Sequence, residues 1–205
     1  MKRSAEDAKK TKQAILVASL TAFEEHGWRG ATFEIIARAA GVSRGALNHH
    51  FDSKFELLVE ALQFGWSKFG DQLFAEDTST ANAADNLRNL LHRYVQWLQD
   101  DSQFRSLVAT TVIVAPQSSG SGSPKKTDAL DSWKHNIENC LASAKDLPVS
   151  QHMVARNVVV FLQGLAVTAI THPAELPSKA ELQVTVDYLV DGFLGVAEVP
   201  KKVMS

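Results

Sequence analysis

The sequence predicts an all-α protein of about nine helices. Apolar residues recur at the three- and four-residue spacing of helices along most of the 205-residue chain. In two places a serine is followed three residues later by a glutamate, at Ser53 and Glu56 and at Ser178 and Glu181, a pattern that caps the start of a helix. Residues 104–115 are rich in β-branched side chains, which favour strands. One strand would have no partner in a helical chain, so we expect a buried helix there.

The first three helices are closely spaced, and the second and third are short. Residues 5–25 carry one apolar stripe, and Gly27 supplies a stop. Thr32 can cap a second helix. Gly41 follows its last residues, where the end of a helix often needs a positive φ. Ser43 can then cap a third helix of about seven residues.

The remainder of the chain predicts six longer helices. The first of them starts at the capping serine of residue 53 and is long enough to act as a connector. Polar stretches at 76–85 and 116–124 interrupt the apolar pattern, and the second of these reads as a flexible loop. The six expected helices cover approximately 54–73, 87–98, 104–115, 126–144, 151–171 and 179–196.

Residues 32–58 carry the clearest functional signal. Two short helices joined by a glycine turn form a unit that presents its second helix to the major groove of DNA. Leu47 and Phe51 are four residues apart and point back into the core together, so the other side of that helix faces outward. Arg44, Asn48 and His49 would approach bases, with Lys54 on phosphate. The predicted DNA-binding residues are Thr32, Ser43, Arg44, Gly45, Ala46, Asn48, His49, His50 and Lys54.

This segment resembles the DNA-binding domain of TetR-type (tetracycline-repressor-like) transcriptional regulators over roughly residues 10–60. The matching positions are Ile15, Ala18, Phe23, Gly27, Thr32, Ile36, Ala37, Ala40, Gly41, Val42, Ser43, Gly45, Leu47, His50, Phe51, Lys54 and Leu57. The resemblance implies a helix-turn-helix DNA-binding domain at 1–53 and a helical ligand-binding and dimerisation domain at 54–205. Asn48 stands where the family usually has tyrosine. This change removes the tyrosine that the family would place on the DNA backbone. DNA binding itself is still expected, because asparagine can pair with an adenine edge.

Charge and composition agree with such a protein. Residues 1–54 contain nine Lys and Arg against six Asp and Glu, a balance of +3, whereas the whole chain is −2, so the remainder is −5. A basic end attracts phosphates while the acidic remainder does not. No apolar run approaches the ~20 residues of a membrane span, and the N-terminus lacks the apolar core of a signal peptide. Cys140 stands alone, which excludes a disulfide framework and favours a reducing, cytoplasmic location.

The last two expected helices, 151–171 and 179–196, predict a dimer. The first is apolar nearly all round, and a helix of that kind is buried on more than one side. A central core helix without a dimer role is the alternative. The resemblance implies a two-fold dimer through a four-helix bundle, whose two heads would read a palindromic operator. The predicted interface residues are Val154, Val158, Leu162, Leu165, Leu182, Val186, Leu189 and Phe193.

Many aromatic side chains fall on the helices between the head and the C-terminus. Most read as ordinary core, but as a set they can line an apolar cavity with a few polar groups, which is how small-molecule sites are built. The resemblance implies an effector pocket in this region without naming its residues or its ligand. The candidate ligand-binding residues are Phe64, Trp66, Phe69, His92, Gln96, Trp97, Phe104, Trp133, Asn136 and Phe161.

Together these patterns favour a ligand-responsive DNA-binding regulator, most simply a repressor that a small molecule releases from its operator. A helical protein-interaction module or an enzyme is the alternative. For an enzyme, the chain shows no Ser-His-Asp signature, phosphate-binding glycine loop or paired carboxylates. The seven histidines are scattered without a metal-binding motif. We therefore expect no metal, no cofactor, no catalysis and no membrane partner.

Overall fold

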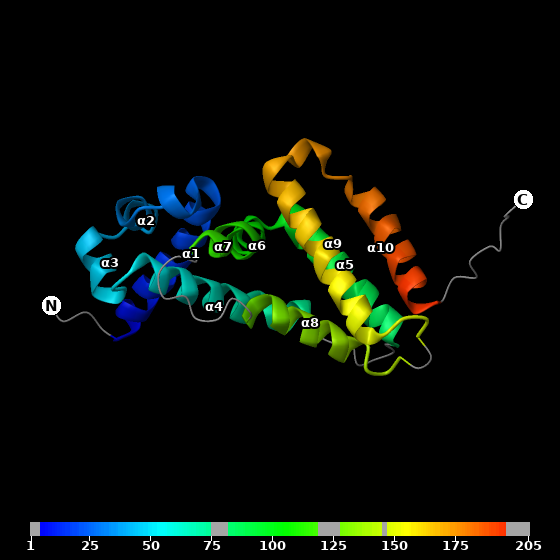
Figure 1. Cartoon of the computed structure of the whole chain (residues 1–205). Coiled ribbons are helices and arrows are strands. Elements are labelled where there is room, and N and C mark those ends of the chain that lie inside the picture. The colour runs from blue at the N-terminus through cyan, green and yellow to red at the C-terminus, as the bar shows by residue number, and fades with distance from the viewer. Residues whose placement is uncertain (1–4, 75–81, 119–127, 145–146, 196–205) are drawn as a thin grey trace, which may run out of the picture.

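The computed structural model describes residues 5–74, 82–118, 128–144 and 147–195. Every regular element within those ranges is helical, which confirms the all-α prediction. Figure 1 shows α1 to α3 at one end of the molecule, which we call the head, and the remaining helices, which we call the body. The elements are α1 Ala5–Gly30, α2 Phe33–Ala39, α3 Arg44–His50, α4 Lys54–Leu73, α5 Ala83–Asp100, α6 Ser102–Ala109, η1 Thr110–Val114, α7 Ala115–Gln117, α8 Asp128–Cys140, α9 Gln151–Thr171, η2 Pro173–Glu175 and α10 Lys179–Leu194.

Side-chain caps set the starts of the head helices. The Thr32 hydroxyl accepts a hydrogen bond from the Ile35 amide at 3.3 Å, and the Ser43 hydroxyl accepts one from the Ala46 amide at 3.1 Å. Such caps satisfy amide groups that have no partner inside the helix. Gly27 breaks α1 with φ 65° and ψ −178°, as predicted, although helical backbone resumes beyond it to residue 30. The two helices of the turn therefore begin where the sequence places them.

The β-branched segment 104–115 is helical, as predicted, but part of it is wound more widely than an α-helix. Thr110–Val114 form one turn of π-helix, in which the Ala115 amide donates to the Thr110 carbonyl. The hydroxyls of Thr110 and Thr111 donate to carbonyls four residues earlier, at 2.7 and 2.8 Å. Threonine hydroxyls bonded in this way compete with the regular helical pattern.

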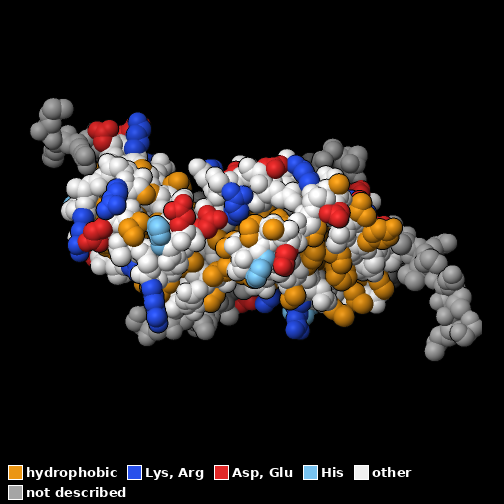
Figure 2. Space-filling model, turned by 90° about the horizontal axis from the view of Figure 1, so that it is seen from above, with side chains coloured by type: hydrophobic (Ala, Val, Ile, Leu, Met, Phe, Trp, Pro, Cys, Tyr) orange, Lys and Arg blue, Asp and Glu red, His pale blue; other side chains and the backbone are white. Residues whose placement is uncertain are grey.

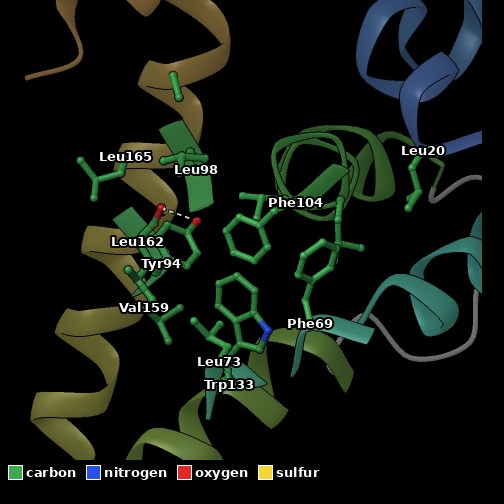
Figure 3. Close-up of a cluster of buried hydrophobic side chains, with 14 of the residues drawn as sticks. Leu20, Phe69, Leu73, Tyr94, Leu98, Phe104, Trp133, Val159, Leu162 and Leu165 are labelled. Carbon is green, nitrogen blue, oxygen red and sulfur yellow. Dashed lines mark hydrogen bonds between the residues drawn. The ribbon is translucent and has the colours of Figure 1, made fainter. Parts of the chain in front are cut away.

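An aromatic cluster joins the body helices (Figure 3). Phe104 of α6 is fully buried, and its ring lies 5.3 Å from the rings of Phe69, Tyr94 and Trp97 in edge-on arrangements. The Tyr94 hydroxyl donates to the Leu162 carbonyl of α9 at 3.1 Å, and burial raises the pKa of this phenol above its ordinary value. One cluster thus fixes α4, α5, α6 and α9 against each other.

The head is attached to the body along α1. Ser106 of α6 donates a hydrogen bond to the Glu24 carboxylate, and Arg105 pairs with the same carboxylate at 3.8 Å. The Thr110 hydroxyl of η1 lies 3.4 Å from the Leu20 carbonyl. Helix α1 is therefore held against the body by α6 and by the π-helical turn that follows it.

Helix α9 departs from the expectation that no segment approaches a membrane span. By length and composition alone, Gln151–Thr171 is apolar enough to cross a membrane. The prediction overlooked it because scattered polar residues such as Asn157 and Gln163 interrupt the apolar run. Eight residues of α9 are buried against the rest of the chain, so much of its apolar character belongs to the core of the body.

Candidate nucleic-acid interface and ligand pocket

Helix α3 has one buried side and one free side. Leu47 and Phe51 are 0% and 1% exposed, so they anchor the helix in the core of the head. On the opposite side, Arg44, Asn48 and His49 are exposed to solvent. Gly45 is exposed with them and carries no side chain to hold another surface away. The prediction of inward and outward residues on this helix is confirmed for these six residues.

Arg44 is held by an acidic neighbour. Its guanidinium pairs with the Glu34 carboxylate of α2, and the two side chains are 62% and 50% exposed. Thr32 and Ser43, which cap α2 and α3, are also exposed to solvent. An approaching phosphate would meet the positive group of Arg44 with the negative group of Glu34 beside it. Glu34 was not among the predicted site residues, because a glutamate in the first turn of a helix reads as support for that helix.

Three other predicted DNA-binding residues are partly buried. Ala46 and His50 are half-buried, and the His50 ring lies 6.3 Å from the ring of Phe51. Lys54 is half-buried too. Its ammonium donates to the Trp28 carbonyl at 2.5 Å and lies 4.6 Å from the centre of the indole ring.

Partial burial also lowers the pKa of the Lys54 ammonium below its ordinary value. Desolvation disfavours the charged form of a lysine, which accounts for the direction. In the structure, Lys54 therefore ties the start of α4 to the end of α1. No local pattern in the sequence indicates this contact, because Trp28 lies 26 residues earlier.

A pocket of about 570 Å³ lies between α4 and α8. Trp66 and Trp133 form part of its wall, with ring centres 4.7 Å apart and ring planes 79° apart. The Trp66 indole N–H donates to the Thr111 hydroxyl at 3.0 Å, which connects the wall to η1. The lining residues are Leu62, Gln63, Trp66, Gly70, Asp71, Phe74, Ser132, Trp133 and Asn136.

Three of the ten candidate ligand-binding residues, Trp66, Trp133 and Asn136, line this pocket. The other seven lie elsewhere, because neither aromatic character nor helical position reveals which neighbour covers a side chain. Phe69, Trp97 and Phe104 belong to the aromatic cluster, and Phe64 borders a small separate cavity against α1. Gln96 is exposed, Phe161 is partly buried, and His92 lies 3.5 Å from Asp187 of α10.

The predicted dimer residues require a correction. The side chains of Val154, Val158, Leu162, Leu165, Leu182 and Val186 are between 0% and 8% exposed within the single chain. They have no surface left for a second subunit, so the prediction took the core-facing stripe of both helices. Leu189 and Phe193 are only partly buried and retain some surface.

The free apolar surface lies on the other side of these two helices. Figure 2 shows apolar side chains gathered at the end of the body where α9 and α10 lie. Here large apolar side chains are exposed that a soluble surface seldom carries together. We call this surface the α9–α10 face, and its exposed members are Met153, Val160, Val167, Val184 and Tyr188.

Among the described residues, no group of three His, Cys, Asp or Glu is placed to hold a metal ion. Cys140 is buried in α8. The candidate functional features of the described residues are the outer side of α3, the pocket and the α9–α10 face.

The fold is that of a two-domain helical protein. Its head has the helix-turn-helix arrangement of DNA-binding domains, and its larger body contains the pocket. Residues 15–61 match the model described as bacterial regulatory proteins, tetR family. This part of the chain is similar to the tetR family. The match covers α1 from residue 15 onward, α2, α3 and the start of α4.

Individual relatives agree with this assignment. The chain is 44% identical over 61 residues to the HTH-type transcriptional regulator TtgW of Pseudomonas putida, covering 30% of this chain and 46% of TtgW. The match to CymR of Pseudomonas putida is 30% identical and covers 47% of this chain and 48% of CymR. The chain thus spans about half the length of these curated relatives or less.

The solved structures extend the likeness to the whole fold. SmeT, the repressor of the Stenotrophomonas maltophilia multidrug efflux pump SmeDEF, is 23% identical with a TM-score of 0.71, over 96% of this chain and 98% of SmeT. A transcriptional regulator from Rhodococcus sp. Rha1 is 24% identical with a TM-score of 0.74, over 92% of this chain and 98% of that one. At this identity the comparison establishes the fold of the body, and the body's ligand stays open.

Proposed function

We propose that this protein is a transcriptional regulator that binds a palindromic operator as a homodimer and is released by a small molecule. Residues 1–53 would read DNA, and residues 54–205 would bind the effector and the second copy. The observation that carries the proposal is the two-sided nature of α3. Leu47 and Phe51 fix one side in the core, while Arg44, Asn48 and His49 stand free on the other.

Direct reading of DNA fits the exposed residues of α3. An arginine can pair bidentately with guanine and an asparagine with adenine, both in the major groove. Gly45 would let the backbone approach the duplex closely. A helix of seven residues contacts few bases, so two copies on adjacent half-sites are needed for a specific site.

The α9–α10 face supports the proposal that the protein is a homodimer. A two-fold axis through this face would bring the same apolar side chains of both chains together. Val160 and Tyr188 are 65% and 75% exposed in the single chain. We expect Val160→Asp to convert dimers to monomers in sedimentation, because it places a charge inside the interface. Gln96→Asp, an exposed change on α5, should leave the dimer intact; equal behaviour of the two variants would place the interface elsewhere.

The pocket supports response to a ligand. SmeT has been solved as a complex with triclosan, and the pocket here is placed against the connector α4. A ligand shifts the balance between two conformations only if it binds one of them more tightly. Binding at Trp66 would favour a conformation of α4 in which the two heads no longer match their half-sites. Such a regulator acts in the cytoplasm, where its DNA is.

The test is DNA binding by the full chain to the region upstream of its own gene. We expect the logarithm of the affinity to fall steeply with the logarithm of the salt concentration. Arg44→Ala should weaken specific binding by about tenfold, the effect of losing one good base contact. Lys134→Ala removes a positive charge from α8 and should change little. If Arg44→Ala and Lys134→Ala bind as tightly as the parent, α3 does not read DNA.

A further inference from the structure

The pocket between α4 and α8 has a distinctive charge. Its apolar walls come from Leu62, Phe74 and the two tryptophans, and its polar groups from Gln63, Ser132 and Asn136 are neutral. Asp71 is the one charged side chain among the described residues that line it. The pocket thus combines aromatic surface with a single carboxylate.

The positive side chains on the two helices are engaged elsewhere. Lys68 donates to the amide oxygen of Gln103 at 2.6 Å, and Lys134 pairs with Asp131 at 2.9 Å. No ion pair is formed by Asp71 with any residue that the structure describes. Its carboxylate is therefore available to a ligand in the pocket.

The three charge classes of ligand differ in what they would do to this carboxylate. An anion would be repelled by Asp71. A neutral molecule could bond to the amides but would cover the carboxylate without replacing its water, which costs free energy. A cation with an apolar body would pair with Asp71 and place its apolar part against the aromatic wall. Tryptophan rings also attract cations directly.

We propose that this pocket binds a lipophilic organic cation, an amine or quaternary ammonium carried on an aromatic or aliphatic body. The volume of about 570 Å³ falls within the range of roughly 300–1,000 Å³ that holds drug-sized ligands. The claim that this cation is the effector rests on the proposed function. The claim that it binds rests on the pocket alone.

The experiment compares three probes with the same apolar body and different heads: (4-phenylbutyl)trimethylammonium, 5-phenylpentan-1-ol and 5-phenylpentanoate. Titration calorimetry on the full chain measures their affinities without relying on DNA. We expect the ammonium to bind at least about tenfold more tightly than the alcohol, and the carboxylate to bind most weakly. Because Asp71 is exposed as well as pocket-lining, screening by solvent limits the preference to about this size.

Asp71→Asn should reduce the affinity for the ammonium by about tenfold, equal to ~1.4 kcal/mol, and leave the alcohol unchanged. Asp131→Asn is the matched control. It removes the same charge from α8 at a residue that pairs with Lys134 and does not line the pocket. Equal affinities for ammonium and alcohol, no measurable binding of the ammonium, or equal effects of Asp71→Asn and Asp131→Asn would each overturn the proposal.

The outcome separates from that of the proposed function. If the ammonium binds through Asp71 but the chain shows no salt-dependent DNA binding, the pocket assignment stands and the regulator assignment fails. If DNA binding depends on Arg44 but Asp71→Asn leaves ammonium binding unchanged, the regulator stands and the cation proposal fails.

Discussion

Two glycines of α4, Gly65 and Gly70, should respond in opposite ways to substitution by alanine. Replacing a glycine inside a helix by alanine is normally favourable by ~1 kcal/mol. A Cβ added at Gly65, however, would lie 2.5 Å from Cδ1, 3.2 Å from Cδ2 and 3.3 Å from Cγ of Leu107. Leu107 is 0% exposed in α6, so it has little room to move. Three atoms of one packed side chain would have to shift together.

Overpacking of this kind costs typically 1–3 kcal/mol. Set against the gain in helix propensity, we expect Gly65→Ala to lower the free energy of unfolding by about 1 kcal/mol. Gly70→Ala is the control on the same helix, since nothing lies within 4 Å of its added Cβ. We expect Gly70→Ala to raise the free energy of unfolding by about 0.5–1 kcal/mol.

The assay is urea unfolding followed by circular dichroism, with all variants at one protomer concentration, because a dimer's stability depends on concentration. In a Leu107→Ala background, the contacting atoms are gone, so Gly65→Ala should become stabilising. Equal gains for Gly65→Ala and Gly70→Ala in the parent chain would refute the argument that α4 and α6 touch through a required glycine.

Three further predictions concern single contacts. Glu34→Gln should raise affinity for non-operator DNA several-fold at low salt in fluorescence anisotropy, since it removes the negative charge that faces the helix-α3 arginine; unchanged affinity would argue against a phosphate nearby. Tyr94→Phe should lower the free energy of unfolding by about 1 kcal/mol, because it deletes the buried bond to the Leu162 carbonyl, and an unaltered urea midpoint would contradict this. Hydrogen bonds from the side chain of Ser178, and to a smaller extent from its backbone, lower the pKa of the Glu181 carboxyl. The stability that these bonds contribute is present above the pKa of this carboxyl in the unfolded chain, and it is lost as the pH falls through the pKa in the folded chain. Ser178→Ala should therefore reduce the acid sensitivity of α10 in pH-dependent unfolding, and an identical pH profile would show that the cap contributes nothing.

Local signals in the sequence were enough for the head. Ser43 and Ser53 mark helix starts because their hydroxyls accept from amides three residues later. Leu47 and Phe51 lie one turn apart, so their common direction follows from helical geometry alone. These inferences need only residues close together in the chain. For that reason the exposure of Arg44, Asn48 and His49 was predicted correctly.

The body required knowledge of partners far along the chain. Helices α9 and α10 have apolar residues on two sides, and periodicity cannot tell which side meets the core and which meets solvent. Val158 and Val160 look alike in the sequence, yet they are 1% and 65% exposed. For the same reason, most of the predicted ligand-binding residues lie outside the pocket. In the sequence Asp71 looks like an ordinary surface carboxylate. Only the structure shows that it lines the same pocket as Trp133, which lies 62 residues later.

The π-turn at Thr110–Val114 has a consequence for how the chain tolerates changes in length. A π-turn accommodates one residue more than the α-helix would at the same place. Deleting one residue from an ordinary helix rotates everything beyond it by about 100° and exposes its buried side. Deleting one within Thr110–Val114 would instead restore a regular helix and leave both flanks facing the way they do now. Among the described helices of the body, this turn is therefore where the loss of a single residue does the least damage to the packing on either side.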